Sequence, residues 1–122
     1  HFLDSDIIKS NFNKAKMEGS HFQYAKIIMG TFVKANINYG DFRYSVAVEC
    51  DFEGAQLKEA NFQGAILSGS SFERANLENA NFCGAKLSGV LFKGARLSNA
   101  KIDKSTKLPN DLNKKTMEKL II

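Results

Sequence analysis

The chain has 122 residues, enough for one domain, and it is mildly basic, with 17 Lys and Arg against 13 Asp and Glu and a formal net charge of +4. No apolar run approaches the ~18 residues that span a bilayer, and no secretory signal pattern is present, which favours the cytoplasm over a membrane. The sequence has no phosphate-binding glycine loop, no disulfide pattern and no convergent catalytic set, so we expect neither an enzyme nor a bound cofactor or metal.

One five-residue period runs through most of the chain. A large apolar residue returns every five residues from Phe2 to Ile102, and only Ala47 among these 21 positions is small. A small residue returns in the same way from Ser5 to Ser105, and only Val90 among these 21 positions is bulky. A period of five fits neither a helix nor a strand. It needs a chain that turns a corner in every repeat and points two of five residues inward.

Four such repeats predict a four-sided coil of twenty residues. Stacked strands lie roughly 4.8 Å apart, so about five coils make a rod roughly 25 Å long. The large residues sort into two opposite phenylalanine columns (Phe2, Phe22, Phe42, Phe62, Phe82 and Phe12, Phe32, Phe52, Phe72, Phe92) and two mainly aliphatic ones (Ile7, Ile27, Ala47, Leu67, Leu87 and Met17, Ile37, Leu57, Leu77, Leu97). A random period-five pattern would not produce this regularity. We therefore predict an all-β stack of coils.

The first coil, residues 1–20, opens with a histidine. His1, His21 and Asp41 lie twenty residues apart and would stack on one outward column. Imidazole and carboxylate groups are ordinary metal ligands. We interpret all three as solvated surface residues, and we predict no metal site.

Residues 21–50 contain the candidate interaction surface. On one side of the predicted coil the outward positions are apolar, whereas the outward positions of the other sides are mostly polar. The surface comprises Ile8, Ile28, Met29, Val46, Val48 and Ile66, with Tyr24 and Tyr44 on the adjoining side. A contiguous apolar patch indicates an interface. The alternative is that β-branched residues suit strands without any partner, and that the tyrosines form a simple ring ladder. Ala47 lies beneath this patch, so we expect the wall to be altered or dimpled there.

Residues 51–100 are the most regular repeats, and residues 101–122 leave the register. Glycines follow the central residues by two positions at 54, 64, 69, 84, 89 and 94, which predicts corners with positive φ. After Ile102 the next position is Lys107, which cannot point inward. Asn110 or Asp111 can cap a helix. We predict a repeat domain over residues 1–106 and a short helix within residues 107–122 that caps the last coil, with a membrane-surface or partner-binding helix as the alternative.

The repeats resemble the A(D/N)LXX unit of the pentapeptide-repeat family. Asn76-Leu77, Asn61-Phe62 and Asn81-Phe82 are the best matches, and the resemblance covers residues 1–106. It implies a right-handed quadrilateral β-helix. It says little about function, because the family carries many roles on one scaffold.

We interpret the chain as a non-enzymatic protein-interaction or scaffold module that binds a protein partner or itself. One alternative is a modulator of DNA gyrase or topoisomerase, as in family members that present an acidic rod resembling DNA. The charge disfavours it, because the four sides carry 0, +1, +1 and 0 and the segment from Ser105 adds +2. A second alternative is the repeat region of a larger secreted bacterial effector. Lys14, Lys34 and Arg74 share a column with acidic neighbours, so we do not expect nucleic acid as a partner.

Overall fold

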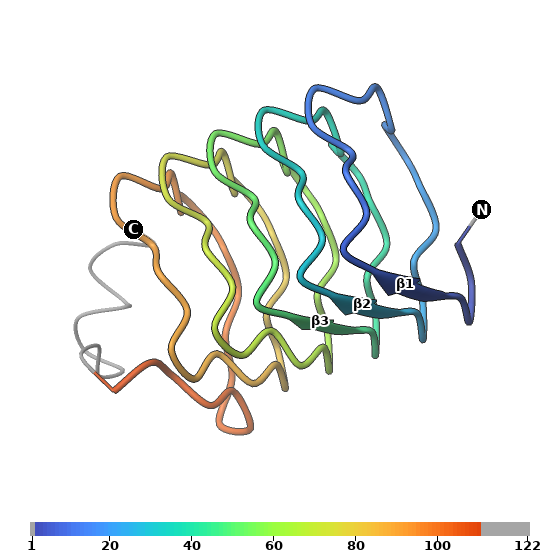
Figure 1. The fold of residues 1–122 in the computed structure, drawn as a ribbon. Coiled ribbons are helices and arrows are strands. Elements are labelled where there is room, and N and C mark those ends of the chain that lie inside the picture. Colours follow the sequence, from blue (N-terminus) through green and yellow to red (C-terminus); the bar gives the residue numbers. More distant parts are fainter. Residues whose placement is uncertain (1, 111–122) are drawn as a thin grey trace.

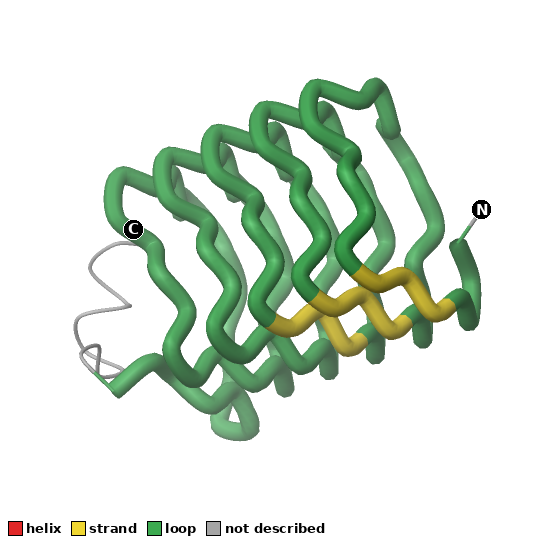
Figure 2. Tube along the Cα trace, viewed as in Figure 1, coloured by secondary structure: helices red, strands yellow, loops and turns green. Residues whose placement is uncertain are grey.

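The chain winds into a stack of coils that advance along one axis, in a computed structural model that describes residues 2–110 (Figure 1). Parallel bridges join residues twenty apart, such as Asn61 and Asn81. Three strands form on one side: β1 (Asp6–Ile8), β2 (Lys26–Ile28) and β3 (Val46–Val48), the yellow segments of Figure 2. They make a parallel sheet in the order β1-β2-β3. The all-β prediction and the twenty-residue coil are confirmed.

Each corner is a turn that runs from a central large residue to the next small one. Ala65 N donates to Phe62 O at 3.0 Å, and Gly64 has a φ of +67°. These are the features of a type II turn. Asn61 fixes the same corner, because its Oδ1 accepts a hydrogen bond from Gln63 N at 3.0 Å. The Asn of the repeat therefore sets the turn, while other backbone groups bond to the coils on either side.

Positive φ belongs to the corner position rather than to glycine. The six glycines that predict such corners have φ between +66° and +72°. Within the described residues, Gly19 and thirteen non-glycine residues at equivalent corners also adopt positive φ; the thirteen are Asp4, Lys9, Lys14, Tyr24, Met29, Lys34, Tyr39, Tyr44, Glu49, Glu59, Arg74, Asn79 and Asn99. Lys, Tyr and Glu rarely take this conformation. The bonds between coils therefore impose it on whichever residue the corner holds.

Phenylalanine rings fill the axis of the stack. The ring of Phe52 is fully buried and stacks on Phe32 and Phe72, with centroids 4.7 and 4.8 Å apart. It meets Phe42 and Phe62 edge to face at 5.9 and 6.4 Å. The two predicted phenylalanine columns thus face each other across the core, and the same geometry recurs in every coil.

The wall keeps its register at Ala47, the one small central residue. Ala47 pairs with Ile27 as the other coils pair, within continuous strand β3. The buried hydroxyl of Ser70 donates to Ala47 O at 2.7 Å and accepts from Cys50 N at 3.0 Å. Ser70 therefore ties this part of the wall together. The expected alteration of the wall does not extend to the backbone pairing, while a dimple in its outer surface stays a prediction.

The buried thiol of Cys50 makes stability depend on pH. Burial raises its pKa from 9.0 to about 11. The unfolded chain then loses this proton at lower pH than the folded chain, so the stability from the neutral thiol is complete below about pH 9 and is lost as the pH rises through about 11. We expect the free energy of unfolding to fall across this window, with a slope of up to about 1.4 kcal/mol per pH unit.

Urea melts of the native chain and of Cys50→Ala, taken at several pH values across that window, check this expectation. Cys50→Ala should remove most of the slope. The half-buried Cys83 gives the matched control, and Cys83→Ala should keep most of the slope. Identical pH profiles for the native chain and Cys50→Ala would show that folding does not hold the Cys50 thiol neutral.

The coils continue one bridge past residue 106. Lys107 forms a parallel bridge with Lys86, twenty-one residues earlier, and Leu108 packs against the core. The extra residue is absorbed in a turn in which Thr106 N donates to Asp103 O at 3.1 Å. Residues 2–110 contain no helix, so the first four residues of the predicted segment 107–122 are not helical. The rest of that predicted helix, residues 111–122, lies outside the described residues.

Candidate interaction surface

The outward face of the three-stranded sheet carries the apolar column predicted from the sequence. Ile8, Ile28 and Val48 occupy equivalent places in β1, β2 and β3. The side chain of Ile8 is 66% exposed, while Ile28 and Val48 are half-buried by their neighbours in the column. The column becomes polar at Ser68 and Ser88 in the next two coils. The structure therefore brings these three residues together on one surface.

A second apolar column lies beside the first on the same side. Val46 and Ile66 are bridge partners in successive coils, and both are half-buried. Met29 lies at the corner that follows Ile28, and 37% of it is exposed. Lys26 and Lys86 bound this second column at its two ends. The six aliphatic residues of the prediction thus form one patch with charged and hydroxyl groups around it.

The two predicted tyrosines stack on the adjoining side. The rings of Tyr24 and Tyr44 are 5.5 Å apart at an interplanar angle of 18°, and they are 60% and 47% exposed. Only the buried Ser45 separates Tyr44 from Val46 along the chain. The tyrosine pair and the aliphatic patch therefore meet at one corner of the stack. We call the combined surface of these eight residues the corner surface.

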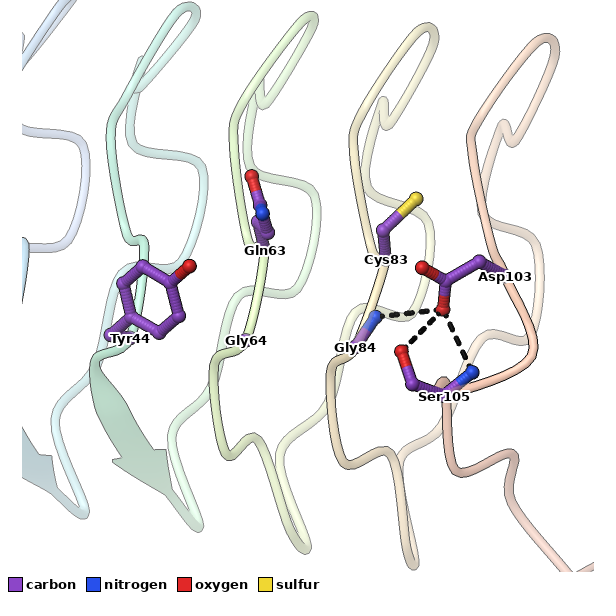
Figure 3. Close-up of a pocket in the computed structure, with 7 residues that line it drawn as sticks. All are labelled: Tyr44, Gln63, Gly64, Cys83, Gly84, Asp103 and Ser105. Carbon is purple, nitrogen blue, oxygen red and sulfur yellow. Dashed lines mark hydrogen bonds between the residues drawn. The ribbon is translucent and has the colours of Figure 1, made fainter.

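Two shallow grooves flank the tyrosine pair. The smaller, of about 190 Å³, is lined by Leu3, Gln23, Tyr24, Arg43 and Tyr44. The larger, of about 310 Å³, lies between Tyr44 and the turn at Asp103 (Figure 3), and its lining residues are Tyr44, Gln63, Gly64, Cys83, Gly84, Asp103 and Ser105. It exists because two successive glycines follow Tyr44 in its column. Sequence reasoning missed both grooves, although the paired glycines and the outward Leu3 gave a signal for each.

Charged groups near the grooves are largely engaged within the chain. Arg43 bonds both carboxylate oxygens of Asp41, with Nη2 to Oδ2 at 2.7 Å and Nε to Oδ1 at 2.9 Å. Burial would raise the pKa of Asp41, but these bonds and the charge of Arg43 hold it below its usual value. Gln23 Nε2 also donates to Asp41 Oδ2 at 2.9 Å and lies 3.4 Å from His21 Nδ1. The cluster is an internal network rather than an open anion site.

Asp103 organises the far wall of the larger groove. Its Oδ1 accepts hydrogen bonds from Ser105 Oγ at 2.6 Å, Ser105 N at 2.9 Å and Gly84 N at 3.1 Å (Figure 3). These bonds lower the pKa of Asp103, led by the Ser105 hydroxyl. Partial burial and the nearby Asp103 charge raise the pKa of Cys83. The thiol is therefore held in its neutral, weakly nucleophilic form.

Within residues 2–110, no three His, Cys, Asp or Glu side chains lie close enough to hold a metal ion. The column of His1, His21 and Asp41 is only partly described, because His1 lies outside those residues. The two members that the structure places are tied to Gln23 and Arg43. The described part of the chain also has no helix long and apolar enough to cross a bilayer.

Two family models match the sequence. One, described as "Pentapeptide repeat region", matches residues 5–82. The other, described as "Pentapeptide repeats (8 copies)", matches residues 75–106. Together they match residues 5–106, which covers most of the stacked coils. No protein with a curated description matches the chain.

Three of the solved structures that match this chain come from cyanobacteria and a plant. One is alr5209, a pentapeptide repeat protein from Nostoc Pcc 7120, which is 22% identical over 89% of this chain and 82% of that chain, with a TM-score of 0.62. Rfr23 from Cyanothece 51142 is 24% identical over 84% of each chain, with a TM-score of 0.49. A thylakoid-lumen protein of Arabidopsis thaliana is 25% identical over 79% of this chain and 70% of that chain, with a TM-score of 0.48. The likeness to alr5209 supports the stacked-coil fold.

Proposed function

Because the chain belongs to the pentapeptide-repeat family, we propose that it is a non-enzymatic interaction module, a right-handed quadrilateral β-helix that binds a protein partner through its corner surface. The observation that carries the proposal is the column of Ile8, Ile28 and Val48, apolar side chains stacked on the outside of a sheet whose other outward positions are mainly polar. Contiguous apolar surface on an otherwise polar protein is where partners dock.

The shape of the corner surface suits a protein partner. The aliphatic patch lies on one side of the stack and the stacked tyrosines lie on the next, so a partner that spans the corner meets both. Tyr side chains are enriched at interfaces because they combine a large apolar ring with a polar tip. The flanking groove beside Leu3 and Arg43 adds a hollow for a partner side chain.

The size of the surface predicts a transient contact. About five coils spaced roughly 4.8 Å apart give a side ~25 Å long. One such side offers a few hundred Å² to a partner, below the ~800 Å² that each protein contributes to a stable complex. A partner that also contacts Tyr24 and Tyr44 on the adjoining side would bury a larger area than one side alone offers. A second copy of the chain can dock patch to patch on the same residues, and this self-association is one form of the proposal.

Charge argues against the gyrase-directed alternative. A rod that resembles DNA needs an acidic surface to enter a basic groove, whereas this chain has a net charge of +4. A supercoiling assay separates the two functions. Inhibition of gyrase by micromolar protein, or protection of gyrase from a quinolone, would favour the alternative.

Val48→Glu tests the corner surface directly. A carboxylate at the centre of the patch should leave folding intact, because Val48 points outward, and it should weaken partner binding at least tenfold, since a buried unpaired charge is costly. Ser88→Glu is the matched control, with the same charge in the same column two coils away. The measurement is the set of proteins that the immobilised chain retains from its own organism, compared among the three variants.

The expected result is a protein that the native chain and Ser88→Glu retain and Val48→Glu loses. Sedimentation equilibrium of the same three proteins identifies self-association, which would appear as a native dimer that Val48→Glu converts to a monomer. If Val48→Glu and Ser88→Glu change neither retention nor mass, or change them equally, the corner surface is not the binding site.

A further inference from the structure

Charge is segregated along the axis of the stack, although it is mixed when counted by side. Residues 86–107 carry six cations and one carboxylate, a net charge of +5. Residues 1–85 carry eight cations and ten carboxylates, a net charge of −2. The positive charge of the protein is therefore concentrated at the end of the stack that Figure 1 shows in orange. Charged residues that only keep the surface hydrated would be spread along the whole stack. The difference in net charge between the two ends therefore indicates a separate role for the basic end.

The cations of the last turn are exposed to solvent. They are Lys86, Lys93, Arg96, Lys101, Lys104 and Lys107, and each is exposed. In the described part of the chain, one ion pair involves them, between Arg96 Nη2 and Glu78 Oε1 at 3.2 Å. The carboxylate of Asp103 bonds to Ser105 and Gly84. The positive potential at this end is therefore only weakly neutralised within the chain.

These cations surround the stack instead of lining one face. Lys93 lies on the side centred on Phe92 and Arg96 on the side centred on Leu97, while Lys101 precedes Ile102 on the next side. Lys107 and its bridge partner Lys86 lie on the fourth side. All but Lys86 fall within residues 93–107, which is less than one coil, so their Cα atoms lie close to one plane across the axis.

An apolar side chain breaks the polar surface at the same end. Leu91 bridges Ser71, and its column reads Asn11, Thr31, Asp51, Ser71 and Leu91. Leu91 is 50% exposed, two residues before Lys93 on the same side. Exposed apolar groups beside Lys and Arg are the combination that holds proteins at the surface of an anionic bilayer.

We propose that the last turn of the stack, residues 86–107, docks on the surface of a bilayer that contains anionic lipids, with the axis of the stack directed toward the surface. A planar ring of cations fits a planar anionic partner, because every cation can approach it at once. Duplex DNA is a narrow cylinder and would meet only one side of the ring. The net negative charge of the other coils favours the same orientation, since it is repelled by the surface.

Sedimentation with lipid vesicles tests the proposal with the full chain. The vesicles are phosphatidylcholine alone or phosphatidylcholine with about a quarter phosphatidylserine, a composition that gives a negative surface potential. We expect the chain to sediment with the anionic vesicles and not with the neutral ones. The triple variant Lys101→Gln, Lys104→Gln, Lys107→Gln should lose on the order of a hundredfold in partition coefficient, since each basic residue contributes about fivefold.

The matched control removes the same charge from the opposite end. Lys14→Gln, Lys26→Gln, Lys34→Gln changes three exposed lysines in the first two coils and should bind anionic vesicles about as well as the native chain. Equal losses in both triple variants would show a response to net charge alone and overturn the proposal. Absence of native binding to anionic vesicles would also overturn it. A short DNA duplex bound more tightly than the vesicles, and lost in the first triple variant, would replace the bilayer by nucleic acid.

Discussion

Replacing Phe52 by Ala is expected to lower the free energy of unfolding by about 3–5 kcal/mol. Phe52 is fully buried and contacts four other rings, two by stacking and two edge to face. The methyl group of Ala fills little of the space between the coils. Packed walls relax only partly around such a cavity, so the loss includes both the transfer of the ring and the cavity.

Urea unfolding followed by circular dichroism measures this effect. Lys58→Ala is the matched control, because Lys58 is exposed on the same coil, and its substitution should change stability by less than about 0.5 kcal/mol. Each coil contacts mainly its neighbours, so the defect at Phe52 should also reduce the cooperativity of unfolding by dividing the stack near its middle. Equal losses for Phe52→Ala and Lys58→Ala would contradict the inward assignment of the phenylalanine columns.

Gly64→Ala is expected to destabilise the protein by about 2–3 kcal/mol, through two separate effects. The φ of +67° is strained for a residue with a Cβ, which costs about 1–2 kcal/mol. A Cβ on Gly64 would also lie 2.5 Å from Cδ1 and Cε1 of Tyr44. The tyrosine ring must then move and lose its stacking on Tyr24, an interaction that contributes about 0.5–1.5 kcal/mol.

Gly19→Ala separates the two effects. Gly19 has a φ of +71°, but a Cβ there would meet nothing within 4 Å, so only the backbone strain applies. Gly64→Ala should therefore cost more than Gly19→Ala, and the excess should disappear when Tyr44→Ala is combined with Gly64→Ala. The free energies of unfolding of these variants give the comparison. An excess that persists without the tyrosine ring would show that the contact with Tyr44 does not cause it.

The fold follows from the sequence because its signal is repeated twenty-one times. Large apolar residues at all but one of the 21 central positions leave one arrangement that buries nearly all of them, and residues twenty apart bridge as that arrangement requires. The glycine pattern also predicts corners with positive φ, but it predicts fewer of them than the structure has. Tyr44 and Lys34 adopt the same positive φ, because the bonds between coils override the preference of the single residue. The period shows only that the register is lost at Lys107, whereas the one-residue insertion that lets the coil resume appears only in the pairing.

The sequence predicts those parts of the candidate site in which similar residues repeat along a column, and it does not predict the parts that depend on single residues. Ile8, Ile28 and Val48 stand out because three coils repeat the same choice. Leu3 and Leu91 stand alone in polar columns, so single outward positions gave a weak signal. The groove beside Tyr44 depends on the missing side chains of Gly64 and Gly84. The net charge of each side does not reveal the basic last turn, because the cations of that turn are distributed over all four sides.

A coil of twenty residues makes the surface of this protein sensitive to chain length in steps of five. Deleting one repeat between Ile28 and Val48 would turn every later side by a quarter relative to the coils before it, so that Val48 would no longer continue the column of Ile8 and Ile28. Duplicating a whole coil of twenty residues would instead lengthen every column and keep the residues of each column stacked on one another. Changes in length by whole coils are therefore the route by which such a protein can extend its binding surface without rebuilding it.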